Sequence, residues 1–412
     1  MAPRGDADGD EDFPHWRRTL AAMLTVQVIM SGAFNFTTPV LPLFLPELGV
    51  SGDAQLYLWC GGLAAVTSLV AALLSPVWGR IADRRGRKQM VLRSTCAIGL
   101  CTILMGFCQD AWQMLGARIL MGVFAGFSAA TVILISTQVP TRRLTFALGV
   151  MSSGQLVGSL LGPVIGGAMA DLAQSYRLPF FAGGVLSLGA CLVCLFGVRE
   201  VFVPGSGEGA RRSVLASLRR LAGDRGLAAL VGVLLLAQFA TQAVQPIVAL
   251  YVHDIVGDQP NLATLGGIAL SATGLAGMVA VPLLGRAGDR IGETRVLILA
   301  LAGAALATAP QAIAGSYGGF VAERLALGIF VGSIVPVANA LIAKRTPAAE
   351  RGVTLGITSS AYFLGNSFGP ACGGAVAAFV GLPWVFVLTT ALLAVGVAWV
   401  AAAVPGRGGE RE

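Results

Sequence analysis

The sequence predicts an all-α integral membrane protein with twelve transmembrane helices, arranged as two pseudo-symmetric halves of six. Three observations predict this class: charged residues are scarce, they fall between long apolar runs, and the two halves of the chain repeat the same motifs. Of the 412 residues, 55% are hydrophobic and 12% are charged, whereas soluble domains carry about 25% charged residues. Because lipid offers no hydrogen-bond partner to the backbone, we expect the spans to be helices.

The spans follow from the spacing of the charges, since one span needs roughly 17–25 apolar residues. The runs without charge cover 19–46, 54–79, 94–109, 119–141, 144–170, 178–198, 226–253, 259–285, 296–322, 325–343 and 352–406. The short third run extends backward through 89–92, and the last run divides at a turn over 381–383. The sequence therefore predicts a tail at 1–14, a first half at 15–200, a linker at 201–224, a second half at 225–404 and a tail at 405–412.

The basic residues predict the orientation. All but three of the 28 lysines and arginines lie in the termini or in alternate loops, the exceptions being Arg118, Arg177 and Arg324. This positive-inside pattern predicts that both termini and the linker are cytoplasmic. It also accounts for the net charge of +7, so the expected partner is the lipid bilayer and not nucleic acid. In the linker, leucines alternate with arginines, which fits either an amphipathic helix on the inner leaflet or a flexible connection.

The chain repeats its landmarks about half a chain length apart, in the same order. The segment Gly-Arg-Ile-Ala-Asp-Arg-Arg-Gly at 79–86 reappears as Gly-Arg-Ala-Gly-Asp-Arg-Ile-Gly at 285–292. Arg118 recurs as Arg324, and the Gly-Pro-xx-Gly-Gly segment at 162–167 recurs at 369–374. Two similar halves about an axis along the membrane normal suit a carrier that rocks around a site at their interface.

With these motifs, the chain resembles the major facilitator superfamily over its full length. The 79–88 segment matches the family's loop signature between helices two and three, and 158–167 is similar to the helix-five signature of its antiporter branches. Segments 75–83 and 111–118 resemble the twelve-helix drug/proton antiporters, most closely the MdtG-like efflux proteins. The resemblance implies multidrug efflux by proton antiport in the bacterial inner membrane. It also implies a small-molecule substrate, the proton as coupling ion and a monomeric protein.

Polar residues inside the spans are candidates for a substrate cavity, because polar groups that face lipid are costly. Gln238, Thr241, Gln242 and Gln245 form one stripe at helical spacing, and the corresponding stripe in helix one includes Asn35 and Thr38. Helices five and eleven carry further stripes. The alternative is that these groups only hydrogen-bond neighbouring helices. The candidate cavity residues are Gln27, Asn35, Thr38, Arg118, Gln238, Gln242, Gln245, Tyr362 and Asn366.

A second set of candidates concerns gating and coupling. The resemblance implies that Arg118 influences proton coupling and that Asp83 belongs to a latch on the cytoplasmic side. Some relatives carry an acid in the middle of helix one, but this chain has none between Asp12 and Glu47. The titratable candidates are therefore Glu323 and Asp83, followed by Asp171. The gating and coupling candidates are Asp83, Arg87, Arg118, Asp289, Glu323 and Arg324, and the helix-packing hinge comprises Gly158, Gly162, Pro163, Gly166, Gly369 and Pro370.

The motif survey weighs against other classes of function. The sequence contains no GxxxxGK[ST] loop for ATP and no HExxH motif, so we expect no enzyme, cofactor or metal site. An ion gradient is then the energy source. The alternative function is a facilitator or importer of a small metabolite, against which the 158–167 signature weighs.

Overall fold

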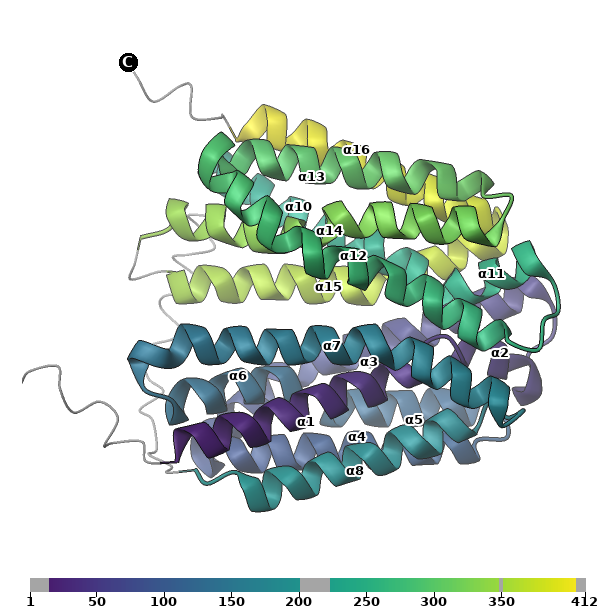
Figure 1. Ribbon diagram of the computed structural model, residues 1–412, viewed down its shortest axis with the longest axis horizontal. Helices are drawn as coiled ribbons and strands as arrows, with labels where there is room; N and C mark the ends of the chain where they lie inside the picture. The colour runs from purple at the N-terminus through teal and green to yellow at the C-terminus, as the bar shows by residue number, and fades with distance from the viewer. Residues whose placement is uncertain (1–14, 201–222, 348–350, 405–412) are drawn as a thin grey trace, which may run out of the picture.

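The computed structural model describes residues 15–200, 223–347 and 351–404, and every regular element in these ranges is a helix. Figure 1 shows the helices running side by side along the longest axis of the molecule. The start of the first helix and the end of the last helix lie at one end of the bundle, called here the terminal end. The opposite end, where α2 and α11 lie, is called the distal end. The linker at 201–224, for which the sequence fits either an amphipathic helix or a flexible connection, falls almost wholly outside the described residues.

The first half of the chain supplies six spans, some of them built from two helices. Its elements are α1 (Trp16–Phe36), α2 (Leu41–Phe44), η1 (Leu45–Leu48), α3 (Asp53–Arg85), α4 (Arg87–Phe107), α5 (Ala111–Phe124), α6 (Phe127–Gln138), η2 (Thr141–Arg143), α7 (Leu144–Leu172) and α8 (Leu178–Gly197). The short elements α2 and η1 continue the first span.

The second half repeats this plan. Its elements are α10 (Arg225–Val244), η3 (Gln245–Ile247), α11 (Val248–Val256), α12 (Leu262–Ile291), α13 (Glu293–Thr308), η4 (Ala309–Ile313), α14 (Tyr317–Arg345), α15 (Arg351–Phe379) and α16 (Leu382–Ala403). By length and composition, ten segments of the described residues are candidates to cross a membrane. The pair α5–α6 and the helix α15 complete the twelve predicted spans.

The fourth span is broken between α5 and α6, which the sequence alone did not indicate. Gly126 has a φ of +119° at this break, a conformation that glycine adopts without strain. The break leaves backbone carbonyls without helical partners. Arg93 of α4 donates hydrogen bonds to two of these carbonyls. Its Nη2 lies 3.3 Å from the oxygen of Phe124 and 3.0 Å from the oxygen of Ala125.

Two glycines form the tight turns at the ends of the longest helices of the repeat. Gly86, with φ +92°, joins α3 to α4, and Gly292, with φ +93°, joins α12 to α13. Such backbone angles are strained for other residues. The first turn is further fixed by Glu200, whose carboxylate accepts hydrogen bonds of 2.8 Å from the backbone N–H groups of Arg87 and Lys88. A carboxylate there satisfies free donors at the positive end of α4.

Apolar clusters fill both halves, and one of them reaches across the interface. This cluster lies mainly in the first half, where it includes Met23 and Met114, and it also contains Leu250 and Ala263 of the second half. A separate cluster within the second half includes Leu230 and Ile342. A further cluster of the second half contains packed aromatic rings, among them those of Tyr251 and Phe320. Buried apolar side chains of the two halves therefore pack against each other as well as within each half.

Candidate functional site

The halves meet mainly along two helix pairs, α7 with α12 and α3 with α15. In Figure 1, α12 slopes across the bundle and approaches α7 near the distal end. Small residues permit this approach: a methyl group at Gly167 would collide with the Ala263 carbonyl, and one at Gly61 with the Pro370 carbonyl. The contacts between the halves therefore include backbone against backbone at the distal end.

A carboxylate of the first half caps a helix of the second half at this contact. Asp171, on the last turn of α7, accepts hydrogen bonds from the backbone N–H of Ala263 at 3.3 Å and of Thr264 at 2.7 Å, and from the Thr264 hydroxyl at 2.5 Å. These N–H groups belong to the first turn of α12, which has no partner for them within the helix. The Ser271 hydroxyl also donates to the Leu160 carbonyl at 2.6 Å. These hydrogen bonds join the two halves directly.

The glycines of the predicted hinge pack α7 against the first helix of its own half. A Cβ atom at Gly158 would lie 2.6 Å from the backbone oxygen of Val28, and one at Gly162 2.7 Å from that of Gly32. Gly166 faces Phe36 in the same way. The second half repeats the arrangement, with Gly369 against Phe239 of α10. Pro163 and Pro370 lie inside α7 and α15.

Between these two packed faces, α7 has two exposed edges of different character. Polar side chains at spacings of three and four residues occupy one edge, where Ser152 and Gln155 are exposed and Ser159 is half-buried. Apolar side chains occupy the other edge, where Leu161 and Ile165 are exposed. One helix therefore has both an edge that suits lipid and an edge that suits water or a polar ligand.

Helix α15 has the same two edges, and its polar edge carries an amide pair. Gln238 of α10 donates from Nε2 to Oδ1 of Asn366 at 2.6 Å, and the Tyr362 hydroxyl lies within hydrogen-bonding reach of both side chains. The apolar edge exposes Leu364 and Phe368. The hydrogen bond between Gln238 and Asn366 thus joins α10 to α15. Both side chains are half-buried, so they remain partly accessible.

The stripes on α1 and α10 differ in burial along their length. Gln27 is only 5% exposed and lies inside the packed first half. Asn35 and Thr38 are half-buried, and the Asn35 side chain donates to the Ser31 carbonyl at 2.8 Å. Gln242 is half-buried and Gln245 is exposed. The accessible part of each stripe therefore lies toward the distal end.

The two repeated arginines are buried in their own halves. Arg118 is 7% exposed and Arg324 is 5% exposed. The backbone oxygen of Arg118 accepts a hydrogen bond of 3.2 Å from the Thr67 hydroxyl. Glu323 is half-buried. Within the described ranges, neither the Arg118 Nε nor the Glu323 Oε2 has a hydrogen-bond partner.

Arg324 lines a small cavity within the second half, called here the Arg324 cavity, of about 90 Å³. Its lining residues come from α10, η3, α12, α13, η4, α14 and α16: Thr241, Gln242, Val244, Gln245, Leu270, Thr273, Thr308, Gln311, Arg324, Leu327, Val331 and Thr389. Three residues of the α10 stripe, Thr241, Gln242 and Gln245, are among them. The cavity therefore adjoins the accessible part of that stripe.

The latch candidates are only partly described. Asp83 lies near the end of α3 and Asp289 near the end of α12, but their side chains lie outside the described residues. The backbone of Arg87 is held by Glu200, a residue that sequence reasoning missed because it is far from the loop in sequence. In the second half, Glu293 pairs with Lys344 at 2.7 Å.

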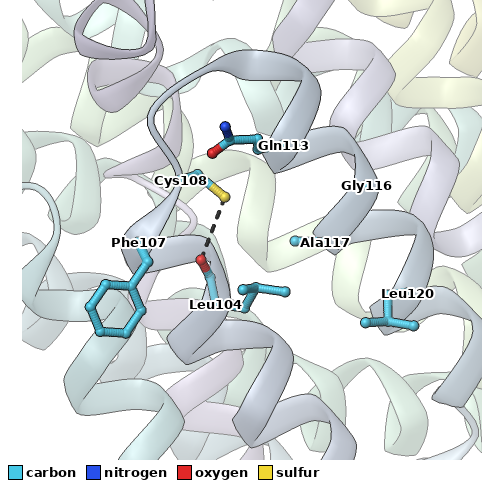
Figure 2. A pocket seen from close by; sticks show the side chains of 7 residues that line it. All are labelled: Leu104, Phe107, Cys108, Gln113, Gly116, Ala117 and Leu120. Carbon is cyan, nitrogen blue, oxygen red and sulfur yellow. Dashed lines mark hydrogen bonds between the residues drawn. The ribbon is translucent and has the colours of Figure 1, made fainter.

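A larger cavity, of about 390 Å³, lies between α4 and α5 and contains none of the predicted site residues. Figure 2 shows the side chains that line it, including Cys108, whose Sγ lies 3.5 Å from the Leu104 carbonyl, and Phe107, which points to one side. Phe107 is 64% exposed and Leu104 and Leu120 are also exposed. This groove therefore lies on the outer surface of the bundle.

Comparisons with known proteins agree on one family. The family model of the Major Facilitator Superfamily matches residues 23–266 and 230–412. The chain is 35% identical to the multidrug resistance protein MdtG of Proteus mirabilis over 92% of this chain and 94% of that protein. It is also 35% identical to MdtG of Salmonella typhimurium, over 93% of this chain and 94% of that protein.

Solved structures share the fold. A bacterial homologue of the lysosomal transporter Spinster, in an inward-facing and occupied conformation, gives a TM-score of 0.74 at 17% identity, over 95% of this chain and 97% of that one. The nucleoside transporter NupG, in a mutant form, gives a TM-score of 0.74 at 14% identity, over 95% of this chain and 100% of that one.

Proposed function

The chain belongs to the Major Facilitator Superfamily, and from this membership we propose that it exports small amphipathic compounds by proton antiport, in the manner of a multidrug efflux transporter. The observation that carries the proposal is the 35% identity to MdtG multidrug resistance proteins over more than nine-tenths of both chains. The chain is thus a transporter, which moves its substrate unchanged. We place it as a monomer in a bacterial inner membrane.

The orientation rests on charge. The loops and helix ends at the terminal end carry most of the basic residues, for example Arg142, Arg143 and Arg225, so this end faces the cytoplasm under the positive-inside rule. The distal end, which Asp171 helps to close, then faces outward. In this orientation the hydrogen bonds between the halves lie on the outer side, as in a state open to the cytoplasm.

The substrate path follows the polar edges. Under this proposal the polar edges of α7 and α15, and the stripes of α1 and α10, face a space between the halves, while the apolar edges of α7 and α15 face lipid. Asn35, Gln242, Tyr362 and Asn366 are half-buried on these surfaces. A few amides on apolar walls suit amphipathic molecules of varied shape, because burial drives binding and the amides orient the ligand.

Coupling requires a group that exchanges a proton as the halves rock. We assign this role to Glu323, with Arg118 and Arg324 as fixed positive charges that set the electrostatic potential of each half. Asp83, Arg87 and Asp289 lie at the terminal end, where we assign them to the latch that closes the cytoplasmic side.

The test is transport in proteoliposomes with an imposed pH gradient and a panel of cationic, neutral and anionic compounds. We expect gradient-driven movement of amphipathic compounds, reduced in Glu323→Gln and Arg118→Ala. Transport of a metabolite down its own gradient, with no effect of the pH gradient, would instead support the facilitator alternative.

A further inference from the structure

The Arg324 cavity contains a buried positive charge without a counter-charge. The guanidinium is almost wholly buried, yet Nε and Nη2 have no hydrogen-bond partner in the part of the chain that the structure describes. The group stays protonated in proteins, and a buried charge without compensation is costly. Among the described residues, no carboxylate lines the cavity. The neighbouring Glu323 is not among the lining residues. The guanidinium carbon of Arg324 lies 5.1 Å from the centroid of the Phe320 ring.

The unpartnered atoms define what would fit. Nε–H and Nη2–H lie along the same edge of a guanidinium and point in parallel, so they match the two oxygens of one carboxylate. Thr273 lines the same cavity, and among the described residues its hydroxyl also has no hydrogen-bond partner. The hydroxyl is able to donate to a carboxylate oxygen.

The size of the cavity limits the ligand to a small group. A volume of about 90 Å³ corresponds to roughly three water molecules at their share of liquid volume. It therefore accepts a carboxylate group but not a whole amphipathic molecule. Gln242 and Gln245 belong both to the cavity lining and to the α10 stripe, so the cavity adjoins that stripe.

We propose that the Arg324 cavity binds a carboxylate group through the Nε and Nη2 atoms of Arg324. The group is either the end of a transported compound or a free monocarboxylate of the size of acetate. The first source rests on the proposed function, whereas the second does not. The repeated Arg118 makes a matched control, because it is equally buried but lines neither of the two cavities described above.

Binding is measured on the purified full-length protein, without transport, as the rise in thermal unfolding temperature with ligand concentration at constant ionic strength. The probes are acetate, phenylacetate and phenylacetamide, the last having the shape of phenylacetate without its charge. We expect both carboxylates to stabilise the wild type and Arg118→Gln, and the amide to have no effect. Arg324→Gln should weaken carboxylate binding at least tenfold, and Thr273→Val should weaken it a few-fold.

Export of phenylacetate from proteoliposomes then separates the two sources. If export of phenylacetate depends on Arg324, the bound carboxylate is part of the transported compound. If acetate binds but phenylacetate is not exported, the bound carboxylate is a resident anion. Both results support the site. If Arg324→Gln fails to fold, Arg324→Lys keeps the charge without the parallel N–H pair and should lose most of the affinity. Equal stabilisation of wild type and Arg324 variants, or no stabilisation by any carboxylate, would overturn the proposal.

Discussion

The Asp171 cap makes a quantitative prediction about the balance between conformations. Its carboxylate holds two backbone N–H groups and one hydroxyl of α12 across the interface between the halves. Hydrogen bonds to a charged group contribute about 1.5–3 kcal/mol, against about 0.5–1.5 kcal/mol for neutral ones. Asp171→Asn keeps one acceptor oxygen but loses the charge. We expect the distal-closed state to lose about 2 kcal/mol, which is roughly a thirtyfold change in the population ratio.

The assay is a distance measurement between spin labels at Ser51 and Asp258, two exposed positions in the loops that follow η1 and α11. The Asp171→Asn protein should show a larger fraction of long distances than the wild type. Asp110→Asn is the matched control, because Asp110 caps α5 through the Gln113 N–H at 2.8 Å within one half. If Asp171→Asn gives the wild-type distribution, the cap does not hold the distal end closed.

Three further predictions follow from the packing and the repeat. Gly158→Ala should destabilise the protein by about 1–3 kcal/mol through overpacking, because the new Cβ would lie 2.6 Å from a backbone oxygen of α1. The control is Gly149→Ala, whose new Cβ would have no described atom within 4 Å, and it should leave the thermal unfolding temperature unchanged. Glu200→Gln should lower the unfolding temperature by weakening the cap of α4, and an unchanged value would refute that role. Asp83→Asn should reduce transport more than Asp289→Asn at equal expression, and equal full activity in both would remove the latch assignment.

The sequence predicted the membrane class, the twelve spans and the repeat because these depend on local composition and spacing. The scarcity of charged residues within each span is visible in the sequence. The four-residue spacing of Gly158, Gly162 and Gly166, which predicts close helix packing, is visible too. The break at Gly126 was not predicted, since glycine is frequent in this chain and nothing local marks one glycine as a break. Its neighbour Arg93, which binds the freed carbonyls, belongs to another helix.

The site was less accessible to sequence reasoning because it depends on pairing between distant segments. The stripe on α10 was visible at helical spacing, but the hydrogen bond of Gln238 to Asn366 was not. Asp171 was considered only as a titratable group, whereas the structure shows that it caps a helix of the other half. The burial of Arg324 beside a polar cavity required the positions of several helices. The roles of these residues in transport remain predictions.

The measurement that tests the central claim most directly is proton movement during transport. Proteoliposomes with a trapped pH-sensitive dye, at equal pH inside and outside, receive an outward gradient of a transported compound. Antiport predicts that protons move inward as the compound leaves, in proportion to the flux of the compound. In control liposomes without the protein, neither the compound nor protons should move. Compound flux without any proton movement would contradict antiport, and proton movement in the same direction as the compound would identify a symporter.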